Sequence, residues 1–170
     1  MGKFVLSVAA VIAAIIVAAG LFLVIAGPAR TWQMIAGNPD LGWFDRSAPA
    51  RSERPNDALM CTPGLCHGVK VDRELPDYAE TPENLIGRID EAMRAVAPYI
   101  RRVDDGGDPA RARYITRTPL MRFPDTNSFE AVALENGRTG LVAYARAQLG
   151  YSDGGNNRKR LDAVIDRLDR

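Results

Sequence analysis

The chain has 170 residues, which is enough for one domain of ordinary size and too few for two large ones. Its formal net charge of +1 excludes nucleic acid as the main partner, because nucleic-acid-binding domains carry a clear excess of positive charge. Its two cysteines and one histidine exclude chemistry that needs several soft ligands.

The N-terminal segment is predicted to be a transmembrane helix. Residues 4–26 contain a single polar side chain, Ser7, and Lys3 is the only charged residue before Arg30. About 20 residues of helix cross a hydrocarbon core of about 30 Å. The run is longer than the apolar part of a cleaved signal peptide, and no convincing cleavage site follows it. We therefore expect residues 1–30 to form an uncleaved anchor; a cleaved signal and a buried soluble helix are the alternatives.

The anchor is expected to cross the membrane once, since no second hydrophobic run follows it. Lys3 precedes the helix and Arg30 follows it, so the charges favour a cytoplasmic N-terminus only slightly. Trp32 and Trp43 stand where aromatic anchors at the membrane interface would lie, and ordinary packing under the domain is the alternative. The prolines of residues 31–53 interrupt any long helix, so this stretch is predicted to be a linker.

The domain is expected to cover residues 54–170, and its first clear element is a helix over residues 81–97. Thr81 is a suitable N-cap, Pro82 suits the first helical position, and Pro98 ends the helix. One apolar stripe at helical spacing is expected to face the core, made of Leu85, Ile86, Ile89, Met93 and Val96.

Strand signals dominate the next part of the chain. Residues 112–118 are rich in β-forming side chains, and residues 128–135 and 139–149 flank the turn signal Asn136-Gly137. Small side chains share one face of the last predicted strand, at Ala143, Ala145 and Ala147. That face is expected to pack closely against a helix.

A C-terminal helix is predicted from about Gly155 to Leu168, with Ser152 or Asp153 as its cap. Its apolar residues recur at helical spacing, at Leu161, Val164, Ile165 and Leu168. The element order predicts an α+β fold in which the transmembrane helix precedes a two-layer domain, a mostly antiparallel sheet with helices packed on one face. The sheet face left uncovered by helices is expected to be the natural binding surface.

Three segments carry a family pattern, in order and with plausible spacing. They are Arg54-Pro55-Asn56-Asp57 with Cys61-Thr62-Pro63-Gly64-Leu65-Cys66, then Leu120-Met121-Arg122-Phe123-Pro124-Asp125, and finally Tyr144-Ala145-Arg146-Ala147-Gln148-Leu149-Gly150-Tyr151-Ser152-Asp153 with Gly155-Asn156-Asn157-Arg158-Lys159-Arg160. Together they resemble the DUF1499 family, a domain of unknown function, over about residues 54–168. The resemblance implies a bacterial protein with an N-terminal membrane segment and implies no reaction. We expect a protein of the bacterial inner membrane with a cytoplasmic N-terminus and a periplasmic C-terminal domain.

Cys61 and Cys66 are predicted to form a disulfide, because Pro and Gly bend the chain between them and an oxidising periplasm favours pairing. Three other interpretations stay open. Cys61, Cys66 and His67 resemble a widely spaced haem-attachment motif, whose usual form is C-x-x-C-H. A zinc site is the second interpretation, but these three residues are fewer than the four ligands that structural zinc needs. A redox-active dithiol is the third, although such dithiols prefer the spacing C-x-x-C at a helix N-terminus. The sequence therefore predicts no cofactor and no metal site.

A cluster of basic residues is the candidate binding site. A Gly-rich turn and a helix start accompany the basic residues, a combination that suits an anion or a phospholipid headgroup. The candidate anion- or lipid-binding residues are Arg122, Arg146, Ser152, Arg158, Lys159 and Arg160. The alternative is structural: Arg158 and Arg160 pair with acids such as Asp153 or Asp162, and Asn156 only caps the helix. Arg122 would then pair with Asp125.

These observations predict a membrane-anchored periplasmic domain that binds a partner, either a membrane protein complex or an anionic lipid, and that contacts the lipid bilayer. The alternative is a small-ligand carrier or enzyme acting at the membrane surface through a cationic pocket. A third hypothesis is redox or haem chemistry at Cys61 and Cys66. No catalytic residue can be assigned, because the chain shows no nucleophile–base pair.

Overall fold

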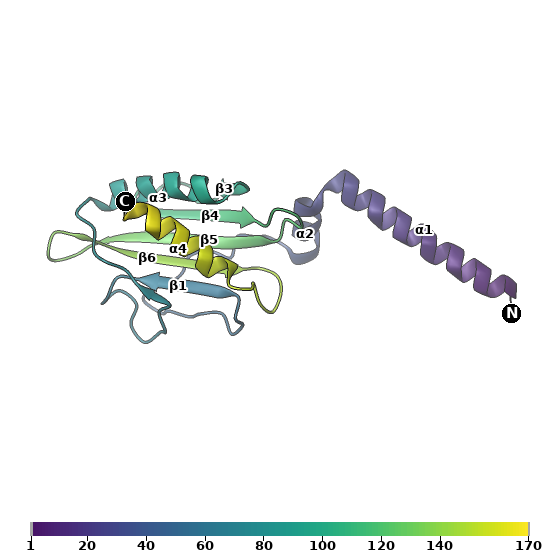
Figure 1. Ribbon diagram of the computed structural model, residues 1–170, viewed down its shortest axis with the longest axis horizontal. Helices are drawn as coiled ribbons and strands as arrows, with labels where there is room; N and C mark the ends of the chain where they lie inside the picture. The colour runs from purple at the N-terminus through teal and green to yellow at the C-terminus, as the bar shows by residue number, and fades with distance from the viewer. Residues whose placement is uncertain (1, 170) are drawn as a thin grey trace.

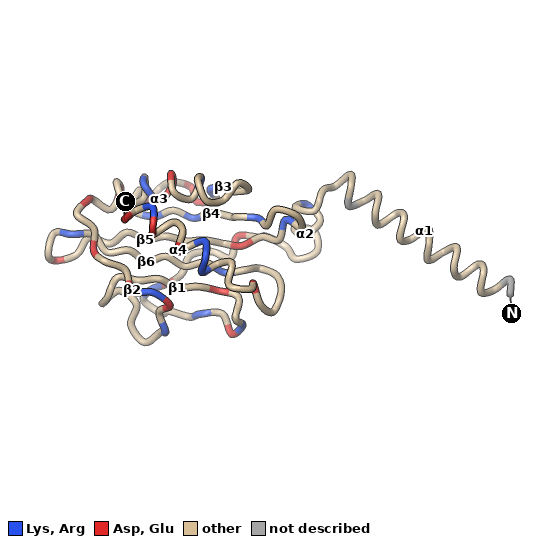
Figure 2. The backbone as a smooth tube through the Cα atoms, in the orientation of Figure 1, with Lys and Arg blue, Asp and Glu red and all other residues tan. Residues whose placement is uncertain are grey.

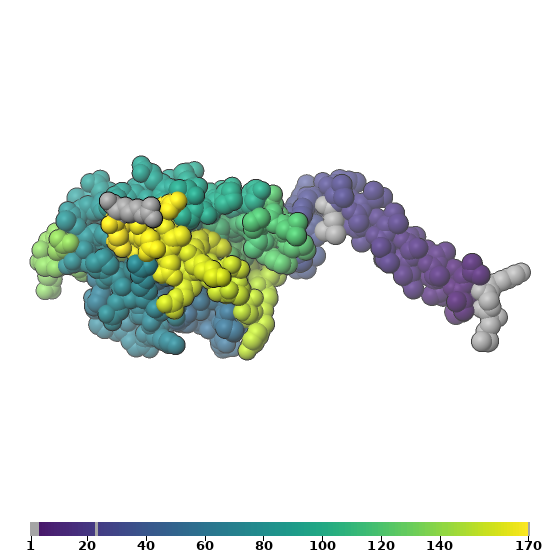
Figure 3. All heavy atoms as spheres, viewed as in Figure 1, coloured from purple at the N-terminus to yellow at the C-terminus, as the bar shows by residue number. Residues whose placement is uncertain are grey.

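The computed structural model describes residues 2–169 and shows a long helix attached to one end of a two-layer domain (Figure 1). Helix α1 (Gly2–Ala26) is followed by the short helix α2 (Pro28–Ala36). Gly27 separates them with a φ of 75°, which lets the chain change direction. Within the described part of the chain, residues 4–26 form the stretch that is long and apolar enough to cross a membrane, and α1 projects from the domain unpacked (Figure 3).

The domain is built on a six-stranded sheet in the order β2-β1-β6-β5-β4-β3. Its strands are β1 (Asp57–Cys61), β2 (Arg73–Glu74), β3 (Ile100–Arg102), β4 (Arg111–Arg117), β5 (Pro124–Ala133) and β6 (Thr139–Ala147). All pairings are antiparallel except that of β1 with β2. The predicted α+β fold is therefore confirmed, whereas β1, β2, β3 and α2 were not predicted.

Two helices, α3 (Pro82–Val96) and α4 (Asn156–Leu168), cover one face of the sheet (Figure 1). Thr81 caps α3 by accepting a hydrogen bond from the Asn84 backbone N–H at 3.3 Å. The predicted apolar stripes face the sheet, and the small side chains of Ala143 and Ala145 let the helices approach closely. The main core lies between these layers, and its largest fully buried residues include Tyr114, Phe129, Leu85, Ile89, Leu161 and Ile165.

The start of α4 differs from the prediction. Its N-cap is Gly155, in the left-handed conformation with a φ of 76°, and neither Ser152 nor Asp153 is the cap. Asp153 still accepts hydrogen bonds from the backbone N–H groups of Gly155 at 2.9 Å and Asn157 at 2.7 Å. Its carboxylate therefore satisfies donors that the first turn of a helix leaves unpaired.

The hairpin between β5 and β6 turns at the predicted place. The Leu134 N–H donates to the Arg138 carbonyl at 2.8 Å, and Gly137 takes a φ of 76°. Ala133 pairs with Thr139 as the last pair of the ladder.

Residues 31–53, predicted as a linker, fold against the sheet face opposite the helices. We call residues 37–53 the strap. The strap is fixed by side chains of the sheet: the Leu41 N–H donates to Thr126 Oγ1 at 3.0 Å, and Arg113 Nε lies 2.8 Å from Asp40 Oδ1. Hydroxyl groups of the sheet thus accept hydrogen bonds from backbone N–H groups of the strap, which forms no regular secondary structure of its own.

The strap covers a second, smaller core. Phe44 packs on Tyr144 with 4.7 Å between ring centroids, and Leu59 and Val142 are buried beside them. The strap therefore covers part of the face that is expected to be open for binding. Arg146 remains exposed on this face.

Cys61 and Cys66 are joined by a disulfide, as predicted, with their Cα atoms 6.3 Å apart. Cys61 is buried in the smaller core at the end of β1, and the exposed His67 follows the closed loop. Because the sulfurs are bonded to each other, the structure provides no free thiol to a haem or to a metal.

Reducing this disulfide is expected to lower the free energy of unfolding by about 2 kcal/mol, because a closed loop this short constrains the unfolded chain only modestly. Urea unfolding of the full chain in detergent micelles, followed by tryptophan fluorescence, measures the effect. The Cys61→Ala/Cys66→Ala variant is the control, since reductant should leave its midpoint unchanged. Equal midpoints for the oxidised and reduced wild-type protein would contradict the prediction.

Candidate functional site

The six residues predicted to form one cationic site lie in three separate places. Arg158, Lys159 and Arg160 lie on α4, on the helix side of the sheet, and Ser152 lies in the loop before α4. Arg146 is on β6 and points to the strap side, and Arg122 is in the turn between β4 and β5. The structure therefore does not bring these residues together as one patch.

Arg160 is committed to a buried network and is not available to a ligand. Its guanidinium donates to Asp125 at 2.6 Å, to Asn127 at 3.0 Å and to Asn157 at 2.7 Å. Burial raises the pKa of Asp125, and the guanidinium of Arg160 opposes that shift. The alternative that Arg160 pairs with an acid is the one the structure supports, although the acid is Asp125.

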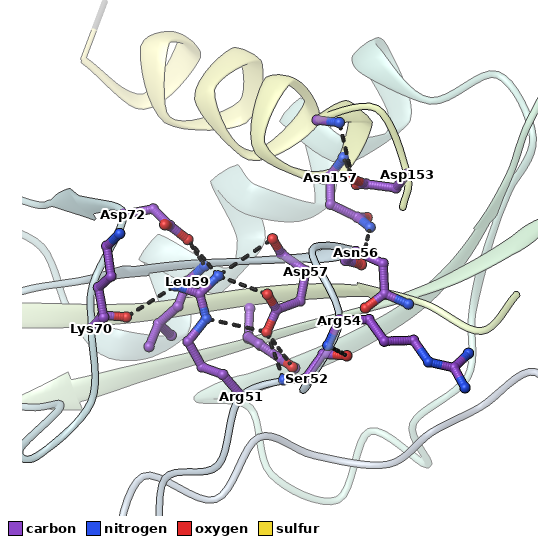
Figure 4. A network of polar contacts seen from close by, with 12 residues as sticks. Arg51, Ser52, Arg54, Asn56, Asp57, Leu59, Lys70, Asp72, Asp153 and Asn157 are labelled. Atoms are coloured by element: carbon purple, nitrogen blue, oxygen red, sulfur yellow. Dashed lines mark hydrogen bonds and ion pairs between the residues drawn. The ribbon is translucent and has the colours of Figure 1, made fainter. Parts of the chain in front are cut away.

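The network continues to the sheet edge and joins all three segments of the family pattern. Asn157 Nδ2 donates to the Asn56 carbonyl at 3.1 Å, and the Asn157 N–H donates to Asp153 (Figure 4). On the same loop Ser152 Oγ accepts from the Gly154 N–H at 3.2 Å. On the outer side of α4 Arg158 approaches Asp162 at 3.8 Å, while Lys159 is exposed.

Arg146 lies beside a hollow on the strap side. It is the one residue of β6 that is exposed, although β6 is a central strand. A cleft of about 420 Å³ opens beside it, lined among others by Arg51, Arg54, Asn56, Arg146 and Gln148. We call this hollow the Arg146 cleft. Arg146 and Leu41 also line a smaller hollow of about 190 Å³ under the strap.

Arg146 has no ion-pair partner among the described residues, and the carboxylate opposite it in the sheet, that of Asp57, is already occupied. Asp57 pairs with Arg146 in the register of β1 and β6, so the two side chains share a face. Asp57 Oδ1 accepts from Arg51 at 2.7 Å, and Oδ2 accepts from the Ser52 N–H and the Tyr144 hydroxyl, each at 2.9 Å. Arg51 also lies 2.8 Å from Asp72 (Figure 4).

The occupied carboxylate is strongly held in its ionised form. Burial alone would raise the pKa of Asp57, but the hydrogen bonds from Arg51, Ser52 and Tyr144 outweigh it and the pKa is lowered. Correspondingly, the hydrogen bond to Asp57 raises the pKa of Arg51, and burial raises the pKa of the Tyr144 hydroxyl. Arg54 points away from this group, toward the cleft (Figure 4).

Two buried acceptors at the cleft have no hydrogen-bond partner in the described chain, Asn56 Oδ1 and Gln148 Oε1. Their orientation is determined by the amide nitrogens. Asn56 Nδ2 donates to the carbonyls of Ala147 and Gly150, and Gln148 Nε2 donates to those of Ala36 and Asn38. Flipping either amide would place two acceptors against each other, so both oxygens remain unpaired.

The lining of the Arg146 cleft therefore includes the guanidinium groups of Arg54 and Arg146, the acid Glu53, and two residues whose buried amide oxygens lack donors, Asn56 and Gln148. Guanidinium groups recognise phosphate and carboxylate, and the acceptors recognise hydroxyl or ammonium groups. This chemistry suits a small polar molecule that carries one anionic group and neighbouring hydrogen-bond donors. No group of His, Cys, Asp and Glu that could hold a metal ion occurs within residues 2–169.

The sequence interpretation missed three lining residues of this site, Arg54, Asn56 and Gln148. All three lie in segments of the family pattern, and strand alternation places Gln148 on the same side as Arg146. The missing information was the position of the strap, which forms the opposite wall.

The comparisons with known proteins agree with the pattern in the sequence. The family described as Protein of unknown function (DUF1499) matches residues 55–168. No curated protein and no solved structure matches the chain.

Replacing Asp57 with Asn is expected to destabilise the domain by about 3 kcal/mol, because it leaves the half-buried Arg51 without its closest carboxylate. The pKa of Asp57 is lowered in the folded state, so its contribution is complete above its unfolded pKa of about 4. The contribution is lost as the pH falls through the lower folded pKa.

Urea unfolding between about pH 7 and pH 3 measures this difference. The free energy of unfolding of wild type should fall toward pH 3, so the difference in this free energy between wild type and Asp57→Asn should become smaller there. Glu53→Gln, an exposed acid in the same segment, is the control and should follow wild type. A gap that stays constant over the whole range would contradict the assignment to Asp57.

Proposed function

The chain belongs to the DUF1499 family, whose function is unknown, and we propose that this member is a membrane-tethered domain that binds a small anionic molecule in the Arg146 cleft. The observation that carries the proposal is the unpaired guanidinium of Arg146 on a central strand. Most arginines of the domain are in ion pairs with carboxylates, for example Arg51, Arg73 and Arg113. Glu53 also lines the cleft but forms no ion pair with Arg146, and a cation in this state is suited to an anion from outside the protein.

The tether is the apolar part of α1, which is exposed along its whole described length and carries no charged residue after Lys3 (Figure 2). In our proposal it crosses the bacterial inner membrane once, with the N-terminus in the cytoplasm and the domain in the periplasm. The disulfide between Cys61 and Cys66 supports this side of the membrane, since disulfides persist in oxidising compartments. Alkylation of both thiols in intact, unreduced cells would contradict it.

Binding is favoured over a purely structural role by the two unpaired acceptors. A buried carbonyl oxygen without a donor costs free energy, and a ligand that supplies the donor recovers it. Asn56 Oδ1 and Gln148 Oε1 would accept from hydroxyl or ammonium groups of the molecule whose anion contacts Arg54 and Arg146. Phosphoethanolamine and glycerol 3-phosphate have both kinds of group and serve as probes.

Isothermal titration calorimetry of the full chain in nanodiscs tests the proposal with inorganic phosphate, phosphoethanolamine and glycerol 3-phosphate. The two probes with donors should bind more tightly than inorganic phosphate. Arg146→Gln should weaken their binding by about tenfold, the expected loss for one charge-assisted hydrogen bond.

Arg158→Gln is the matched control, because Arg158 is an exposed arginine on the opposite side of the sheet. It should bind like wild type. Equal affinity of wild type and Arg146→Gln for phosphoethanolamine, or no binding of any probe, would contradict the proposed function.

A further inference from the structure

The end of the domain next to α1 is formed by α2 and by the turn between β4 and β5 (Figure 1). These two elements are locked together. Trp32 Nε1–H donates to the Met121 carbonyl at 2.6 Å, and its ring centroid lies 4.9 Å from that of Phe123. Gln148 donates to the carbonyl of Ala36 at the end of α2. Helix α2 is thus part of the domain and not a loose connection.

The position of α2 along the membrane normal is limited by its distance from α1. The apolar span ends at Ala26, and α2 begins at Pro28. An extended residue covers at most about 3.6 Å, so α2 begins within about 10 Å of the end of the span. Because the headgroup layer on each side of the hydrocarbon is about 5–8 Å deep, α2 begins within or just beyond the lipid–water interface, and the turn locked to it lies near this interface.

Apolar side chains gather on these elements and point to solvent. Ile35 is 71% exposed and Leu120 is 83% exposed, and Met34 and Met121 are also exposed. Exposed apolar residues that cluster on one surface mark an interaction site. An apolar helix face and an apolar turn at the interface are the features of segments that insert shallowly into a bilayer.

Cations of the same end lack carboxylate partners. Arg30 on α2, Arg101 on β3, Arg117 at the end of β4 and Arg122 in the turn form no ion pair with any acid of the described chain. Burial, and after it the charge of Arg101, lower the pKa of Arg117. Figure 2 shows basic positions on and beside α2 at this end of the domain.

Arg122 is held in place with an unused donor. Its guanidinium lies 3.2 Å from the ring centroid of Tyr99, and its Nη1 is buried without a hydrogen-bond partner. The residue has a φ of 57°, a conformation that costs free energy for a side chain other than glycine. The cost is consistent with a turn whose shape serves a contact outside the chain.

We propose that these residues form a bilayer-docking surface, made of Arg30, Met34, Ile35, Arg101, Arg117, Leu120, Met121 and Arg122. The apolar side chains insert among the uppermost acyl carbons, and the arginines bind phosphate groups of anionic lipids. The proposal rests on the membrane tether of the proposed function. Docking would orient the strands so that they point away from the bilayer. Gln148 lines the Arg146 cleft and donates to the Ala36 carbonyl at the end of α2, so docking would also keep the cleft close to the lipid headgroups.

Hydrogen–deuterium exchange of the full chain tests the proposal in nanodiscs of phosphatidylcholine, with and without phosphatidylglycerol. Amides of residues 118–123 should exchange more slowly when phosphatidylglycerol is present. Arg30→Gln/Arg101→Gln should reduce that protection by about fivefold for each cation removed. Arg167→Gln, an exposed cation at the C-terminal end of α4, is the matched control and should behave like wild type.

Tryptophan quenching by brominated lipids provides the second readout, in a Trp43→Phe background that leaves only Trp32. Quenching of Trp32 should be strong in wild type and weak in Leu120→Asp, which places a charge on the most exposed residue of the turn. Two results would overturn the docking surface alone: an unquenched Trp32, and exchange of residues 118–123 that does not depend on the lipid. In that case the amides of α1 would still be protected, and the tether would stand. Fast exchange throughout α1 would overturn the tether and the docking surface together.

Discussion

The ion pair between Arg51 and Asp57 determines which charges of this domain are available to a ligand. Asp57 faces Arg146 across the register of β1 and β6 and would be its natural partner. Arg51 arrives from the strap, takes both oxygens of Asp57 and bridges to Asp72, while Tyr144 adds a further hydrogen bond. Arg51 of the strap therefore pairs with the carboxylate that faces Arg146, and Arg146 remains without an ion pair beside the open cleft.

The two sides of the sheet differ in how their inward-facing polar groups are satisfied. On the helix side, Arg160, Asp125 and Asn127 satisfy one another beneath the start of α4. Ion pairs of this kind cost desolvation and contribute more to a unique arrangement than to net stability, which is our interpretation of this network. On the strap side the polar groups near Arg146 are left incomplete. The family pattern contributes residues to both sides, Arg160 on the helix side and Arg146 on the strap side.

Much of the helix side could be predicted from the sequence because its signals are local. The cap at Thr81, the apolar stripes of α3 and α4 and the turn at Asn136-Gly137 each depend on residues close in the chain. The strands β1, β2 and β3 are too short to show alternation. The prolines of the strap predict that no long helix forms there, but they do not reveal that the extended segment packs on the sheet.

The candidate site was harder to predict because it depends on contacts between distant segments. Alternation along β6 already separates Arg146 from Ala145 and Ala147, which face α4, so the residues of α4 could not share its site. Arg160 is enclosed because it pairs with Asp125, and Arg146 stays without an ion pair while Arg51 pairs with Asp57. Neither pairing follows from spacing in the sequence.

The most direct test of this account is the side-chain Nε–H NMR signal of each arginine in the full chain, recorded in nanodiscs while phosphoethanolamine is added. The account predicts that the signal of Arg146 shifts with saturation, while that of Arg51, held by Asp57, stays in place. An unchanged Arg146 signal at concentrations that saturate binding, or a shift of Arg51 in its place, would contradict it.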